Sequence, residues 1–172
     1  MTEREDILNT FGRHRHGSRE DLVGEHPLGH ALQIISFVGF LLLWVTDSFF
    51  LRLSTFPAEF IPFSIRLIPA IPLFYLAVYL LRSSHNAVFG QVREKPQVIT
   101  GGVFSISRHP LYLSALLFYA VFFLTTLSLL SLAFLGCIFF SYNFLAAFEE
   151  RLLEEKHGKE YREYKGKTRR WL

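Results

Sequence analysis

The sequence has a single cysteine, Cys137, and this scarcity excludes two kinds of site. One thiol cannot form an intramolecular disulfide, and no pair of cysteines has the spacing of a zinc ligand set. Because Cys137 lies in the middle of an apolar run, we expect it to pack against lipid or helices rather than act as a nucleophile. We expect no metal site either, because His26 and His30 are separated by Pro27 and have no third ligand.

Charge is also scarce, since charged residues make up 19% of the chain and the formal net charge is +3. The basic residues flank apolar runs, so a membrane explains their placement and no nucleic-acid partner is expected. Internal repeats and low-complexity tracts are absent from the sequence. Residues 1–27 are polar, carry acidic residues and contain no apolar run, so we expect a cytoplasmic tail and no cleavable signal peptide.

Apolar residues are abundant, at 51% of the 172 residues, and they include 19 Phe. They form runs close to the length of about 20 residues that a helix needs to cross a bilayer. We therefore predict an all-α, polytopic membrane protein with about four transmembrane helices. The predicted spans are residues 28–53, 61–82, 110–126 and 128–148, within a single membrane domain of residues 28–172. Prolines 62, 69 and 72 should start or kink the second span.

The distribution of Lys and Arg predicts the topology. Basic residues concentrate in the N-terminal tail, in the loop 82–108 and in the C-terminal tail, so both termini and this loop should be cytoplasmic. Residues 125–128 allow only a tight turn, which makes the last two spans an antiparallel hairpin with a cytoplasmic helix after it. Residues 106–112 and 149–164 should consequently lie close together at the cytoplasmic interface.

The segment Arg108-His109-Pro110-Leu111-Tyr112 enters the third span. Pro110 fits the first position of a helix, and its ring keeps His109 out of the helical conformation. His109 is thereby aimed at a helix N-terminus, where free N–H groups favour anions, and Arg108 adds a planar donor fork. Tyr112 lies one turn along on the same face. The alternative interpretation is a basic membrane anchor with a helix-starting proline and an interfacial tyrosine.

Glu149 and Glu150 lie where the fourth span leaves the membrane. Acidic residues do not contribute to positive-inside anchoring, and ionisable groups at this depth usually face a protein cavity. Tyr161 and Tyr164 follow with helical spacing and share a face. The alternative is a solvated amphipathic helix, an interpretation that we accept for the charged residues between 154 and 162.

Two further pairs of polar residues have weaker signals. Asp47 and Arg66 lie near the outer ends of helices, where we expect structural roles, with the two pairing or snorkelling. His85 and Asn86 follow the second span and could either help an acceptor or cap the helix.

Together these motifs resemble the membrane methyltransferases of the isoprenylcysteine carboxyl methyltransferase and phospholipid methyltransferase group. The resemblance covers residues 60–172 and agrees in order, spacing and topology. The matching motifs are Gly102-Val103-Phe104, Arg108-His109-Pro110-Leu111-Tyr112, Glu149-Glu150-Arg151-Leu152-Leu153, His157-Gly158 and Tyr161-Arg162-Glu163-Tyr164. Two departures are His157 in place of the usual Phe and the absence of the usual Pro near the end.

The resemblance implies S-adenosylmethionine as cofactor, in a cytoplasmic site formed by residues 84–172. The cofactor's carboxylate suits Arg108 and His109, its ribose and ammonium suit a glutamate, and its sulfonium suits aromatic faces. The predicted catalytic residues are Glu150 and Arg108. The predicted cofactor-binding residues are Gly102, His109, Pro110, Tyr112, Glu149, Glu150, Tyr161 and Tyr164.

The methyl acceptor is expected to be lipophilic and delivered through the membrane, with an isoprenylcysteine-type carboxylate preferred. A carboxylate acceptor needs no general base, whereas for an amine or a thiol one glutamate could accept the proton. A phospholipid amine and a small thiol therefore stay open as acceptors. Other open alternatives are a nicotinamide-dependent membrane reductase and a non-enzymatic scaffold that binds a lipid or a partner.

Overall fold

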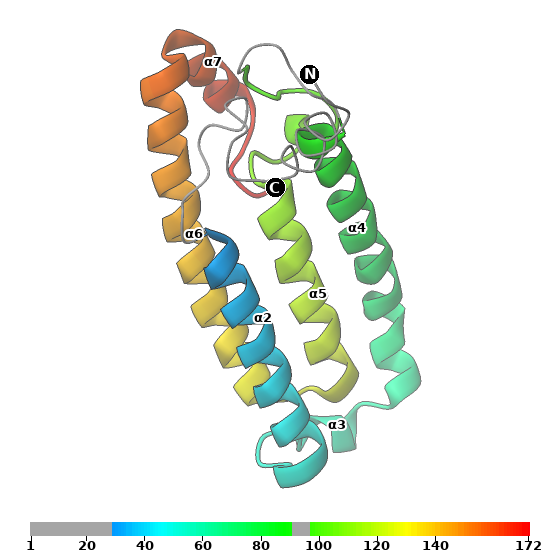
Figure 1. Cartoon of the computed structure of the whole chain (residues 1–172). Coiled ribbons are helices and arrows are strands. Elements are labelled where there is room, and N and C mark those ends of the chain that lie inside the picture. Colours follow the sequence, from blue (N-terminus) through cyan, green and yellow to red (C-terminus); the bar gives the residue numbers. More distant parts are fainter. Residues whose placement is uncertain (1–28, 91–96) are drawn as a thin grey trace, which may run out of the picture.

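The computed structural model describes residues 29–90 and 97–172, and every regular element in these ranges is a helix (Figure 1). Four long helices lie side by side and alternate in direction along the chain. They are α2 (Gly29–Val45), continued by the π-helix η2 (Thr46–Leu51), α4 (Phe63–Phe89), α5 (Pro110–Thr126) and α6 (Leu129–His157). The short elements are α3 (Pro57–Phe60), the 3-10 helix η3 (Gly102–Ser105) and α7 (Lys159–Lys167). The all-α fold predicted from the sequence is confirmed.

Three helical stretches are long and apolar enough to cross a membrane, namely Ala31–Leu51, Phe63–Val88 and Leu129–His157. Helix α5 is also apolar but has only 17 residues. This length corresponds to about 26 Å, slightly less than the hydrocarbon core of about 30 Å. Large apolar side chains such as Ile35, Ile68 and Phe140 are exposed on α2, α4 and α6. An apolar exterior of this extent fits contact with lipid rather than with water.

Two helices extend beyond the spans predicted from composition. Helix α4 continues to Phe89 instead of ending at residue 82, and α6 continues to His157 instead of ending at residue 148. The predicted boundaries mark where apolar residues stop, whereas a helix ends where the backbone requires it. Here those points are Gly90 and Gly158, and the positive φ of 53° at Gly158 is one that glycine adopts at little cost. Pro69 and Pro72 both lie inside the uninterrupted helix α4.

The interior of the bundle is built around α5, which contacts the other three long helices. One buried apolar cluster joins α2, α5 and α6 and includes Phe40, Tyr119 and Tyr142. A smaller cluster of Leu80, Val103 and Leu113 joins α4, η3 and α5. The start of α5 is thereby fixed against three neighbouring elements.

The tight turn predicted between the last two spans is confirmed, and a buried carboxylate braces it. Leu127 ends α5 in the left-handed conformation, with φ 53°, and Ser128 caps α6. Asp47, which is 2% exposed, accepts hydrogen bonds from the Ser128 and Ser54 hydroxyls and from the backbone N–H groups of Leu53 and Ser54. Arg66 instead donates to the Thr125 carbonyl at 2.6 Å. Asp47 and Arg66 thus have structural roles, as expected, but each hydrogen-bonds to other residues in place of the other.

Candidate active site

The site lies at the end of the bundle where α4 ends, α5 begins and α6 passes into α7 (Figure 1). Pro110 is the first residue of α5, and His109 before it has φ −126° and ψ 59°, outside the helical region that the proline ring disfavours. The His109 ring stacks on Tyr112 with 5.7 Å between the ring centroids and an interplanar angle of 13°. His109 is 7% exposed, so this end of α5 holds a buried imidazole in one orientation.

Glu150 lies at the centre of the site and is 1% exposed. Its Oε1 is 3.0 Å from Arg108 Nη2 and 3.3 Å from His109 Nε2. Arg170 donates to both oxygens, from Nε to Oε1 at 2.8 Å and from Nη2 to Oε2 at 3.0 Å. Lys165 Nζ lies 3.8 Å from Oε2. A buried carboxylate is tolerated only with such compensation, and here four potentially cationic side chains provide it.

Glu149 is less enclosed, with a side chain that is 13% exposed. Its Oε1 accepts a hydrogen bond from the Tyr112 hydroxyl, and its Oε2 lies 3.5 Å from His109 Nδ1. His109 therefore bridges the two glutamates through its two ring nitrogens. The structure brings together the two segments that the hairpin argument predicted to be neighbours. The catalytic roles of Glu150 and Arg108 stay predictions.

The two predicted tyrosines of α7 are buried beside this cluster. Tyr164 donates to the Phe104 carbonyl at 2.6 Å, which ties α7 to η3. Burial raises the pKa of Tyr164 to about 12, and burial together with nearby Glu150 raises the pKa of Tyr161, so both phenols are neutral. Gly102 begins η3 in the left-handed conformation, with φ 63°, and is exposed. Contact of these residues with a cofactor stays a prediction.

Sequence reasoning missed three residues that belong to the same cluster, Asn143, Arg170 and Trp171. Asn143 Oδ1 accepts a hydrogen bond from Arg170 Nη1 at 2.9 Å, and the Trp171 ring lies 6.2 Å from the His109 ring. The basic residues near the C-terminus were explained by positive-inside anchoring, so nothing in the sequence distinguished Arg170 as the partner of Glu150. A signal was present in Trp171, because a tryptophan after a polar helix needs an apolar surface to cover it.

Comparison with protein families gives one match. A family model described as phospholipid methyltransferase matches residues 65–160, which is more than half of the chain. The chain belongs to the phospholipid methyltransferase family. The matched region contains the start of α5 and both glutamates, and it ends before Tyr161. Comparisons with curated proteins and with solved structures gave no match.

Membership of this family, together with the three apolar helices long enough to cross a bilayer, identifies an integral membrane protein and a membrane methyltransferase. The family resemblance inferred from the motifs is thereby confirmed. No group of three or more His, Cys, Asp or Glu residues that could hold a metal ion occurs in residues 29–90 and 97–172. His26 and the side chain of His30 lie outside the described residues.

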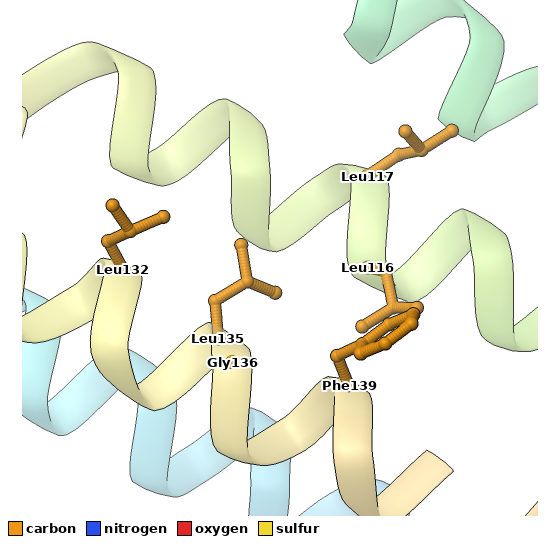
Figure 2. A pocket seen from close by; sticks show the side chains of 6 residues that line it. All are labelled: Leu116, Leu117, Leu132, Leu135, Gly136 and Phe139. Carbon is orange, nitrogen blue, oxygen red and sulfur yellow. The ribbon is translucent and has the colours of Figure 1, made fainter. Parts of the chain in front are cut away.

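An open apolar groove of about 290 Å³ runs between α5 and α6 in this methyltransferase (Figure 2). Its lining residues are Leu116, Leu117, Leu132, Leu135, Gly136 and Phe139. Ring contacts connect the groove to the polar cluster, since Phe139 lies 5.6 Å from Trp171 and Trp171 lies 6.2 Å from His109. Two aromatic side chains, Phe139 and Trp171, therefore lie between the groove and the site.

The buried His109 makes the stability of the site dependent on pH. Burial alone would lower the pKa of His109, but hydrogen bonds and charges from Glu149 and Glu150 outweigh burial and raise it. The stabilisation by protonated His109 is therefore fully present below the ordinary pKa of about 6.5 and is lost as pH rises through the raised pKa. Thermal unfolding of the wild type and His109→Gln, measured between pH 6 and 9, should show the wild-type advantage shrinking with rising pH. An advantage that stays constant or grows would contradict this assignment.

Proposed function

We propose that the protein is an integral-membrane methyltransferase that uses S-adenosylmethionine and methylates a lipophilic acceptor at the Glu149–Glu150–His109 cluster. The observation that carries the proposal is a buried, compensated carboxylate pair beside the start of an apolar helix, in a chain of the phospholipid methyltransferase family. Following the positive-inside rule, we place this end of the bundle and both termini in the cytoplasm.

The donors and acceptors of the cluster fit the cofactor. Among the described residues, Arg108 Nε is a buried donor without a hydrogen-bond partner. It lies beside His109 at the start of α5, where Arg108, His109 and free backbone N–H groups suit a carboxylate. Glu149 is the carboxylate with remaining exposure, and it suits the ammonium or ribose of the cofactor. When bound, S-adenosylmethionine supplies an electrophilic methyl group on a sulfonium.

Glu150 and Glu149 have different proposed roles because their surroundings differ. Both oxygens of Glu150 already interact with cationic side chains, so its proposed contribution is to orient Arg108 and His109 at the reacting centre. Glu149 is the group that would accept a proton if the acceptor is an amine. The remaining contribution of the protein is positioning and the exclusion of water from the displacement.

Two acceptor classes are proposed, in order. A carboxylate of the isoprenylcysteine type comes first, because Arg108, Arg170 and Lys165 surround the site with positive charge. A phospholipid amine comes second and is favoured by the family match. Transfer of a labelled methyl group from S-adenosylmethionine should be measured with both acceptors in the same vesicles. Methylation of either one supports the proposed function and selects the class, whereas no transfer to a lipophilic acceptor would refute it.

The groove between α5 and α6 is proposed to hold one hydrocarbon chain of the acceptor. Its volume is near the lower end, about 300 Å³, of small-molecule pockets, which suits a chain segment rather than a whole lipid. Gly136 lines the groove and a Cβ added to it would meet no atom within 4 Å, so the side chain of Gly136→Leu should occupy groove volume. We expect the variant to lose roughly tenfold in kcat/KM for a long-chain acceptor and little for a short-chain analogue, because only the long chain needs the groove.

Ala133→Leu is the matched control for this prediction. Ala133 is exposed on the same helix, outside the groove lining, and receives the same added side chain. Equal losses for Gly136→Leu and Ala133→Leu, or equal losses for long and short acceptors, would show that the groove does not hold the chain.

A further inference from the structure

The last five residues of the chain, Thr168–Leu172, fold back onto the site after α7 ends. Arg108 donates its backbone N–H to the Arg169 carbonyl at 3.0 Å, and the Ser107 hydroxyl donates to the Arg170 carbonyl at 2.9 Å. Ser107 is completely buried and Thr168 is 8% exposed. The main-chain carbonyls of this C-terminal segment are therefore hydrogen-bonded to the residues that lead into α5.

The Arg170 side chain holds two residues of α6 at once. Nε and Nη2 bind the two oxygens of Glu150, and Nη1 donates to Asn143 Oδ1. A guanidinium that binds both oxygens of one carboxylate fixes the orientation as well as the charge of that carboxylate. Arg108 and His109 contact only Oε1 of Glu150, whereas Arg170 contacts both oxygens.

Trp171 fills the space between the polar cluster and the apolar groove. Its ring packs against both buried apolar clusters and lies 5.6 Å from Phe139, which lines the groove. Its Nε1 is 3.4 Å from Asn143 Oδ1 on the polar side. One face of the site is therefore closed by a side chain from the end of the chain.

We propose that Arg170 is the positioning residue that orients Glu150 in the cofactor site, and that Trp171 forms the wall of this site toward the groove. The proposal rests on the proposed function, because it assumes that the cluster binds S-adenosylmethionine. The family match ends at residue 160, so the match assigns no role to this segment.

The charge of Arg170 should change the pKa of His109, so its electrostatic role can be measured separately from its contribution to packing. The groups that contact His109 are Glu149 and Glu150 of α6, Tyr112 of α5 and Trp171 of the C-terminal segment, and Arg108 and Arg170 act on it through Glu150. Removing the positive charge of Arg170 leaves Glu150 less compensated, so its attraction for a proton on His109 increases. The pKa of His109 should then rise further, a shift that loss of packing alone would not produce.

The test compares Arg170→Gln and Arg170→Lys with the wild type in detergent. The His109 titration is followed by NMR of histidine-labelled protein without ligand, and S-adenosylhomocysteine binding is measured by calorimetry. We expect Arg170→Gln to raise the His109 midpoint and to weaken binding by about tenfold or more, since hydrogen bonds to charged groups are lost. Arg170→Lys keeps the charge but not the fork, so the midpoint should stay near that of the wild type while binding weakens.

Lys167→Gln is the control, because it removes one positive charge from an exposed side chain at the end of α7. It should bind S-adenosylhomocysteine within about twofold of the wild type, as surface substitutions usually have small effects. Arg170→Lys also serves if Arg170→Gln fails to fold. If the wild type binds S-adenosylhomocysteine and both Arg170 variants bind it with the same affinity, the inference is overturned. An unshifted His109 titration midpoint in folded Arg170→Gln would also overturn it. Absence of binding by the wild type would instead overturn the proposed function.

Discussion

Replacing Glu150 with glutamine is expected to destabilise the protein by about 3–5 kcal/mol and to abolish cofactor binding. Glu150 is almost completely buried and is the common partner of Arg108, His109 and Arg170. Glutamine has nearly the same shape, but it cannot compensate the two guanidinium groups, so the largely buried Arg108 and the partly buried Arg170 would lose their shared counter-charge. The free energy of unfolding in detergent and the calorimetric affinity for S-adenosylhomocysteine measure the two effects.

Glu155→Gln is the matched control for Glu150→Gln, because it makes the same chemical change at an exposed position of the same helix. Its stability should lie within about 0.5 kcal/mol of the wild type, as for most surface substitutions. If Glu150→Gln were as stable as Glu155→Gln and bound the cofactor equally well, Glu150 would not be the centre of the site.

Replacing Asp47 with asparagine is expected to cost about 3 kcal/mol of stability while leaving cofactor affinity unchanged. Asp47 accepts two hydroxyl and two backbone hydrogen bonds that join the end of η2 to the turn between α5 and α6. Asparagine can keep its oxygen on the two backbone N–H groups, but its NH2 would face the Ser54 and Ser128 hydroxyls, which lose their acceptor and already accept backbone hydrogen bonds. The site is at the other end of α5 and α6, so it should keep its geometry.

Glu59→Gln controls for the loss of one negative charge at this end of the bundle, since Glu59 is exposed on α3. Asp47→Asn should have a lower free energy of unfolding than Glu59→Gln, by most of the expected loss of about 3 kcal/mol. Weaker S-adenosylhomocysteine binding by a folded Asp47→Asn would contradict the separation of a structural end from a functional end.

The sequence predicted the central part of the site because short-range rules and topology both applied there. Pro110 determined where α5 begins and how His109 is oriented, and both follow from the chemistry of proline. The tight turn after α5 required α6 to return alongside it, which placed Glu149 and Glu150 beside His109. Neither inference needed knowledge of long-range packing.

The C-terminal part of the site could not be predicted in the same way. The direction of the chain after α7 depends on the break at Gly158 and on the burial of Tyr161 and Tyr164, which are tertiary effects. Local sequence cannot specify that Arg170, rather than one of the other basic residues of the tail, reaches Glu150. The ends of α4 and α6 could not be predicted for a related reason, because hydropathy marks the membrane boundary and not the end of a helix.

The central claim is that the Glu149–Glu150–His109 cluster binds S-adenosylmethionine. The most direct measurement is calorimetric titration of S-adenosylmethionine into the detergent-purified wild type, beside His109→Ala and Glu155→Gln. We expect saturable binding to the wild type and to Glu155→Gln, and strongly weakened binding to His109→Ala. A folded wild type that does not bind, or a His109→Ala variant that binds as tightly as the wild type, would contradict it.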